Sequence, residues 1–128
     1  MNALIYIVDD EPTVCGVTRR MLEQAGYTVQ TMHTARRLLP RCVPNRRDLV
    51  LLDVALPDGD GLDLCRQLKS NPATAQVPIV IVSGWCIPGM YEEAVAAGAS
   101  CVLSKPFSLH ELHDCVAQNL TRNGRRTN

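Results

Sequence analysis

The sequence has no apolar run long enough to cross a membrane and no excess of charge of either sign. A membrane-spanning helix needs about 18 apolar residues in succession, and the apolar runs here are only as long as strands. No basic segment followed by an apolar one opens the chain, which argues against a secretory signal. Thirteen basic residues balance thirteen acidic ones, which argues against a broad nucleic-acid-binding face. We therefore expect a cytoplasmic protein that neither enters a membrane nor binds nucleic acid directly.

The cysteines and histidines lack the spacing of a metal site. There are six cysteines and no C-x-x-C pair, and no histidine stands at zinc-finger spacing from any of them. Four cysteines fall within predicted helices or strands, where a free thiol acts as a small core residue: Cys15, Cys65, Cys101 and Cys115. Reduced thiols are therefore favoured over a disulfide framework.

Length and composition fit one compact domain. With 128 residues, 46% hydrophobic and 20% charged, the chain can bury a single core. Five short apolar segments are predicted strands, at residues 3–8, 28–32, 49–52, 79–82 and 101–103. The segments 49–52 and 79–82 are apolar without alternation, which indicates strands covered on both faces.

A predicted helix follows each strand. The first begins at Asp10-Glu11-Pro12 and ends at Gly26. Its predicted buried face carries Val14, Val17, Met21, Leu22 and Ala25. A weak helix lies around residues 35–39, a third lies between a loop at 57–61 and Asn71-Pro72, and a fourth covers 91–97. The last begins at a capping box of Ser108 and Glu111.

Strands that alternate with helices require a parallel sheet with helices on both faces, which is a doubly wound α/β fold. We expect the domain to cover residues 1–120, followed by a polar, frayed tail at 121–128.

Polar side chains follow four of the five predicted strands. The first strand ends in Asp9-Asp10-Glu11, the third in Asp53, the fourth in Ser83 and the fifth in Lys105. Because ligands bind beyond the carboxyl ends of the strands in an open parallel sheet, these groups are expected to converge.

The converging groups have the chemistry of a phosphoryl-transfer site. Carboxylates packed together repel unless a cation neutralises them, and oxygen ligands suit Mg²⁺. A carboxylate can act as the nucleophile, so Asp53 is the candidate. Lys105 would offset charge on the phosphoryl oxygens, and Ser83 would donate a hydrogen bond to one of them.

Four motifs together resemble the receiver domain of bacterial response regulators, the family that includes the chemotaxis regulators. They are Val8-Asp9-Asp10-Glu11, Leu52-Asp53 with Pro57, Asp60 and Gly61 downstream, Ser83-Gly84, and Ser104-Lys105-Pro106-Phe107. Each motif is weak evidence alone, but their order and spacing together are specific. The resemblance runs from the first strand through the last helix.

The resemblance implies a flavodoxin-like fold of five β–α units, with sheet order 2-1-3-4-5, and an aspartyl phosphate on Asp53. Mg²⁺ would be bound directly by Asp10 and Asp53, through water by Asp9, and by the backbone carbonyl of Ala55. A cis peptide would join Lys105 to Pro106.

The resemblance also implies partners. The phosphodonor would be a histidine kinase or a histidine phosphotransfer protein, and the target would be an output protein or a fused output domain. The resemblance does not decide whether phosphorylation produces a homodimer. The chain would not be an enzyme in the usual sense, because it would catalyse only its own phosphorylation and dephosphorylation.

One position departs from the family pattern. Family members usually carry Tyr or Phe three residues before the lysine, and here that residue is Val102. Trp85, two residues after Ser83, is the only tryptophan, and we hypothesise that it partly replaces the missing aromatic. A phosphate-mimic titration that leaves Trp85 fluorescence unchanged would count against this hypothesis.

Three alternative functions share parts of the pattern. A small phosphohydrolase of the haloacid-dehalogenase type needs a second acid two residues after the nucleophile, where this chain has Ala55. A flavodoxin-like FMN protein needs a Ser-, Thr- and Gly-rich loop after the first strand, where this chain is acidic. A pseudo-receiver would bind partners without phosphorylation, and only the chemistry of Asp53 separates it from a true receiver.

Overall fold

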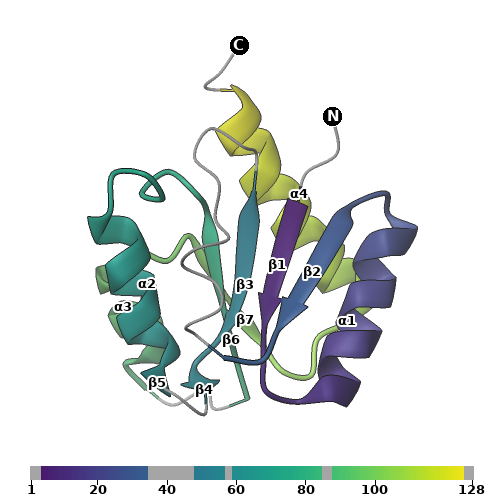
Figure 1. Cartoon of the computed structure of the whole chain (residues 1–128), viewed down its shortest axis with the longest axis horizontal. Coiled ribbons are helices and arrows are strands. Elements are labelled where there is room, and N and C mark those ends of the chain that lie inside the picture. The colour runs from purple at the N-terminus through teal and green to yellow at the C-terminus, as the bar shows by residue number, and fades with distance from the viewer. Residues whose placement is uncertain (1–3, 35–47, 57–58, 85–87, 126–128) are drawn as a thin grey trace.

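A five-stranded parallel sheet forms the centre of the computed structural model, which describes residues 4–34, 48–56, 59–84 and 88–125 (Figure 1). The strand order is β2-β1-β3-β6-β7. The strands are β1 (Leu4–Val8), β2 (Thr28–Met32), β3 (Leu49–Asp53), β6 (Ile79–Ser83) and β7 (Cys101–Ser104). A separate two-stranded hairpin joins β4 (Ala55–Leu56) to β5 (Gly59–Asp60). With the hairpin set aside, the order is the predicted 2-1-3-4-5.

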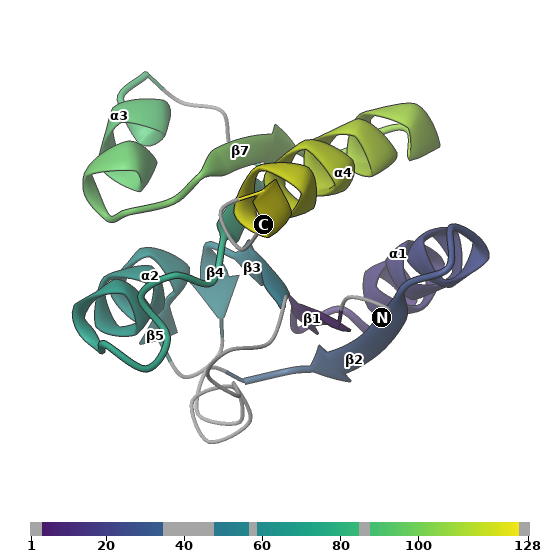
Figure 2. The ribbon, with the colours of Figure 1, turned by 90° about the horizontal axis from the view of Figure 1, so that it is seen from above.

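Helices cover both faces of the sheet. Figure 2 shows α1 (Pro12–Gln24) and α4 (Leu109–Arg125) on one side, and α2 (Gly61–Ser70) and α3 (Met90–Ala96) on the other. Two apolar clusters form the core, one under each pair of helices. This arrangement confirms the predicted doubly wound α/β fold.

The central strands are buried on both faces, as their unbroken apolar sequence predicts. Every residue of β1, β3 and β6 is buried, including the polar ends Asp53 and Ser83. A buried polar group is costly unless it finds a partner, so polar residues at these strand ends call for a specific reason. The strand ends lie together along the lower edge of the sheet in Figure 1.

Helix ends follow the predicted sequence signals. Pro12 lies in the first turn of α1, where its missing N–H removes no hydrogen bond. The Ser108 hydroxyl accepts from the N–H of Glu111 at 3.0 Å, and the Glu111 carboxylate accepts from the N–H of Ser108 at 2.9 Å, which confirms the capping box of α4. Gly98 follows α3 with φ +99°, and a Cβ there would also collide with Lys69.

The predicted buried face of α1 is confirmed at Leu22 and wrong at Val17 and Ala25. Val17 is 51% exposed, and the residues that α1 buries are Cys15, Thr18 and Leu22. Spacings of three and four residues fit both stripes, and the side chains of neighbouring positions point about 100° apart around a helix. The stripe that contains the buried Leu22 faces the sheet, so Val17 is displaced toward solvent.

Two other predictions concern segments at the limits of the described residues. The weak helix expected around residues 35–39 lies outside them. At the other end, α4 continues to Arg125, into residues that the sequence assigns to a polar tail. Apolar periodicity marks the buried face of a helix and not its last hydrogen-bonded turn, so the helix outlasts the pattern. In the part of the chain that the structure describes, no helix is long and apolar enough to cross a membrane.

Candidate phosphoryl-transfer site

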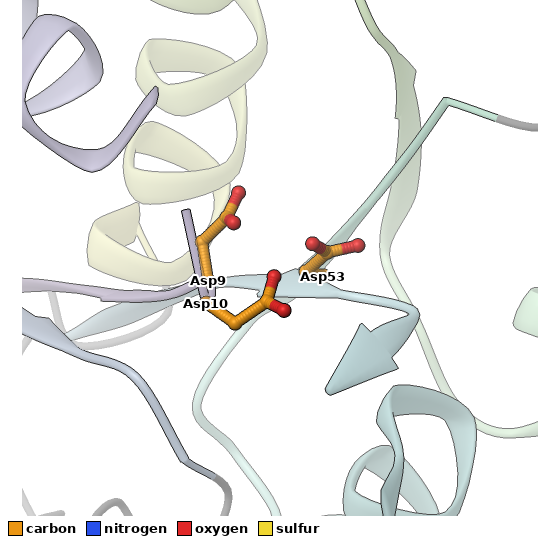
Figure 3. A group of neighbouring side chains, drawn as sticks. All are labelled: Asp9, Asp10 and Asp53. Atoms are coloured by element: carbon orange, nitrogen blue, oxygen red, sulfur yellow. The ribbon is translucent and has the colours of Figure 1, made fainter. Parts of the chain in front are cut away.

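Three carboxylates gather at the carboxyl ends of β1 and β3. Asp9 and Asp10 follow β1 directly, and Asp53 is the last residue of β3. One ligand atom from each lies within 4.8 Å of the others (Figure 3). Because β1 and β3 are neighbours in the sheet, Val8 pairs with Leu52 and the acids after them meet at the same level. The convergence predicted from the sequence is confirmed for these three residues.

Lys105 brings a positive charge between two of these acids. Its Nζ donates to Oδ2 of Asp9 at 2.8 Å and to Oδ2 of Asp53 at 3.3 Å. The lysine reaches them because β7 pairs with β6 in parallel, and the N–H of Lys105 donates to the carbonyl of Ser83 at 2.8 Å. A residue far along the chain is therefore fixed at the acidic site by the sheet itself.

The site holds these charges away from most solvent. Asp9 is 4% exposed, Asp53 is 8% exposed, and the Lys105 side chain is 17% exposed. Burial by itself would lower the pKa of Lys105, but the hydrogen bond to Asp9 and the charges of Asp53 and Asp9 outweigh it and raise that pKa. Lys105 is therefore a firmly charged ammonium at neutral pH.

Charge at the site favours a divalent cation. Three carboxylates face one ammonium among the described side chains, so an excess of negative charge remains. Asp10 is exposed, so a cation can approach from solvent. The donors are all oxygens, which suit hard cations such as Mg²⁺ better than soft ones. The residues present therefore fit a hard divalent cation such as Mg²⁺, which prefers oxygen ligands.

Ser83 and Ala55 lie beside this cluster along the backbone. Ser83 ends β6, is 2% exposed, and pairs in register with Ser104, the residue before Lys105. Ala55 follows Asp53 by two residues and pairs with Asp60 in the β4–β5 hairpin. The structure places both residues near the site, and their roles there remain proposals. The expected cis peptide between Lys105 and Pro106 is present.

The loop after Asp53 is held by a turn that the sequence pattern did not reveal. The N–H of Gly61 donates to the carbonyl of Val54 at 2.7 Å, and a Cβ on Gly61 would overlap the carbonyl of Asp53. Asp60 caps α2, because its Oδ1 accepts from the N–H of Leu62 at 2.9 Å. Strands of two residues are too short to show the alternation of apolar and polar residues that marks a strand. The sequence therefore predicts only a loop at residues 57–61.

Two further side chains fix the carbonyl of Asp9. The thiol of Cys15 lies 3.3 Å from this oxygen and the Nδ1 of His33 lies 2.9 Å from it. A carbonyl only accepts, so Nδ1 of His33 must carry the proton. The carboxylate of Asp9 in turn accepts from the N–H of Glu11 at 2.9 Å. No local sequence pattern predicts these contacts, because Cys15 lies in α1 and His33 follows β2, so both depend on how these elements pack against the end of β1.

The position of the missing aromatic is filled by an ordinary core residue. Val102 is half-buried and packs against the cluster that lies under α2 and α3. Phe107, two residues beyond Lys105, is also half-buried and lines a small pocket next to Asp53 and Lys105. Trp85, which we had proposed as a replacement, lies outside the described residues.

Comparison with known proteins agrees with this geometry. A family model described as the response regulator receiver domain matches residues 5–117. The response regulator MprA of Mycobacterium ulcerans is 37% identical over 112 residues, which are 88% of this chain and 47% of MprA. The KDP operon transcriptional regulatory protein KdpE of Escherichia coli is 34% identical over 123 residues, which are 96% of this chain and 53% of KdpE. The chain thus spans about half the length of these curated relatives.

A solved structure shows the same architecture. The response regulator receiver domain protein (CheY-like) from Methanospirillum hungatei superposes with a TM-score of 0.88 at 25% identity. The match covers 98% of this chain and 99% of that one. The two chains therefore share this fold over nearly their whole length.

Proposed function

Because this chain belongs to the response regulator receiver domain family, we propose that Asp53 is its phosphoacceptor. The observation that carries the proposal is the cluster of Asp9, Asp10 and Asp53 within 4.8 Å, with Lys105 bonded to two of them. An acid placed only to cap a turn needs neither two neighbouring acids nor a buried ammonium.

Asp53 is the proposed nucleophile. One of its carboxylate oxygens attacks the phosphorus of a phosphohistidine, the P–N bond breaks, and the imidazole leaves. The product is an acyl phosphate on Asp53. Water later attacks this phosphorus, releases phosphate and restores the carboxylate. The only turnover proposed for the chain is therefore of its own phosphoryl group.

Lys105 and Ser83 are proposed to bind the transferred group. The ammonium of Lys105 already donates to Asp53, so it can move to a phosphoryl oxygen when the carboxylate loses its charge. Ser83 ends the strand next to β3, and its hydroxyl would donate to a second phosphoryl oxygen. Both groups stabilise negative charge that the carboxylates alone would repel.

The acidic cluster is proposed to hold Mg²⁺. Asp10 and Asp53 would bind it directly, Asp9 through water, and Ala55 through its backbone carbonyl. Bound Mg²⁺ would supply positive charge to the phosphoryl oxygens. The excess of negative charge in the cluster supports this assignment.

The proposed partners follow from this chemistry. The donor is a histidine kinase or a histidine phosphotransfer protein, and the target is an output protein or output domain, with both exchanges in the cytoplasm. A homodimer formed on phosphorylation would be one such output.

Incubation with acetyl phosphate and Mg²⁺, followed by intact mass measurement, tests the phosphoacceptor role. We expect the gain of one phosphoryl group, its loss in Asp53→Asn, and its retention in the control Asp63→Asn. Asp63 is an exposed acid that pairs with Arg66 on α2. A chain that gains nothing from this donor or from a phosphohistidine donor would instead be a pseudo-receiver. Continuous release of phosphate from added phosphomonoesters would indicate a phosphohydrolase.

A further inference from the structure

Two thiols meet outside the acidic site. Cys101 is the first residue of β7 and Cys115 lies within α4, and their Sγ atoms are 3.3 Å apart. Both are free thiols. Neither has a part in the proposed phosphoryl chemistry.

The surroundings of the pair differ from those of an ordinary buried cysteine. Cys65 and Cys15 each point at a backbone carbonyl, at 3.3 Å, whereas the thiol of Cys115 points at another sulfur. The buried amide of Asn119 donates to the carbonyl of Cys115 at 2.7 Å and lies 3.8 Å from its Sγ. The Sγ of Cys115 therefore has two polar neighbours, Cys101 and Asn119, inside an apolar cluster.

The two cysteines differ in how far they are buried. Cys101 is half-buried and Cys115 is buried. Burial, the hydrogen bond to Cys101 and the charge of Cys101 raise the pKa of Cys115 to about 12. Cys115 thus stays a protonated donor, and Cys101, the less buried residue of the two, receives its hydrogen bond. An accessible sulfur with a second thiol beside it is the usual arrangement of a redox-sensitive pair.

We propose that Cys101 and Cys115 form a redox-active dithiol that hydrogen peroxide converts into a disulfide between β7 and α4. The thiolate of Cys101 attacks one peroxide oxygen, the O–O bond breaks, and hydroxide leaves, which gives a sulfenic acid on Cys101. Cys115 gives up its proton and attacks the Sγ of Cys101, the S–O bond breaks, and water leaves. In total two thiols lose two electrons and two protons, and one peroxide becomes two waters.

The two sulfurs already lie close to bonding distance. The sulfurs must approach from 3.3 Å to about 2.05 Å, a shift that side-chain rotation can supply when the backbone positions already suit. The bond would close a loop of the chain that contains Lys105 and the capping box of α4. Closing a loop reduces the freedom of the unfolded chain, so oxidation should raise the thermal midpoint.

Peptide mapping after mild oxidation tests the proposal directly. The experiment uses a variant with Cys42→Ser and Cys86→Ser, which removes the two cysteines outside the described residues. It is treated with stoichiometric hydrogen peroxide, unfolded in iodoacetamide and cut with a glutamate-specific protease. Cleavage after Glu93 and Glu111 separates residues 94–111, with Cys101, from residues 112–128, with Cys115. We expect these two peptides to be joined until a reductant is added, and the intact protein to melt at a higher temperature when oxidised.

Single variants check the order of the two steps. In Cys115→Ser, dimedone should trap a sulfenic acid on Cys101, and in Cys101→Ser it should trap none on Cys115. The control Cys65→Ser removes a buried thiol from the other core cluster and should keep the joined peptides. The proposal is overturned if both thiols remain fully alkylated under conditions that oxidise free glutathione, or if Cys101 joins a cysteine other than Cys115. The mapping uses no phosphodonor, so its result is independent of the role of Asp53.

Discussion

The Nζ of Lys105 lies 2.8 Å from Oδ2 of Asp9, closer than it lies to the proposed nucleophile. This pair joins the residue that follows the carboxyl end of β1 to the residue that follows the end of β7, across 96 positions of the chain. A buried ion pair is sensitive to the removal of one partner, because the other is left charged without compensation. The relationship therefore makes both the stability and the chemistry of the site depend on one lysine.

Replacing Lys105 by Met should lower the free energy of unfolding by roughly 3 kcal/mol in the absence of divalent cations. Added Mg²⁺ should restore part of this loss, because it neutralises the same carboxylates. Urea unfolding with EDTA and with Mg²⁺ measures both effects. Arg19→Met is the control, since it breaks the exposed pair with Glu23 and should change stability by no more than about 0.5 kcal/mol. An equal loss of unfolding free energy in Lys105→Met and Arg19→Met would contradict the conclusion that the stability of the site depends on Lys105.

Asp10→Asn should weaken Mg²⁺ binding by about tenfold or more, since a cation that binds through few carboxylates depends on each of them. Asp10 is exposed, so the variant should keep its fold and its urea midpoint without Mg²⁺. Isothermal titration with MgCl₂ gives the affinity. Asp63→Asn removes the same charge from α2 and should leave that affinity unchanged. Unaltered binding in Asp10→Asn would remove Asp10 from the proposed ligand set.

Two glycine substitutions should act in opposite directions. Gly61→Ala should destabilise the protein and slow phosphorylation of Asp53, because the new Cβ would overlap the Asp53 carbonyl. Gly16→Ala meets nothing within 4 Å in α1 and should stabilise by about 1 kcal/mol, since alanine favours the helix. Thermal unfolding and the acetyl-phosphate reaction give both values. A tolerated Gly61→Ala would show that the turn after Asp53 adjusts easily.

Stability should fall at alkaline pH partly through Cys115. Burial raises the pKa of this thiol from its ordinary value of 9.0 to about 12, so the stability that its protonated form contributes is complete below pH 9 and is lost between pH 9 and 12. Urea midpoints of wild type, measured under a reductant, should therefore decline more steeply over this range than those of Cys115→Ala. Gly16→Ala should shift the midpoint without changing the slope. Parallel curves for wild type and Cys115→Ala would contradict this assignment.

Most of the fold, and the grouping of the site residues at the strand ends, could be predicted from the sequence. Unbroken apolar runs such as residues 79–82 located the buried strands, and the convergence of strand ends placed Asp9, Asp10, Asp53 and Lys105 together. Both inferences rest on backbone geometry that any parallel sheet shares.

Three features of the structure could not be predicted from the sequence. The buried stripe of α1 had a competing stripe one residue away, and only packing against the sheet decides between Val17 and Thr18. The β4–β5 hairpin is too short to have a period. The preference of Lys105 for Asp9 depends on side-chain positions that no local pattern encodes.

The connection from Lys105 to α4 is very short. Only three residues separate the ammonium-bearing residue from Leu109, and Ser108 among them is already tied to Glu111 by two hydrogen bonds. So short a connection cannot absorb a large movement of Lys105 by changing its own conformation. If a change of charge at Asp53 moves Lys105 toward a new partner, the first turn of α4, the longest described helix, should therefore move with it. A charge change at the site and a displacement of α4 would then occur together.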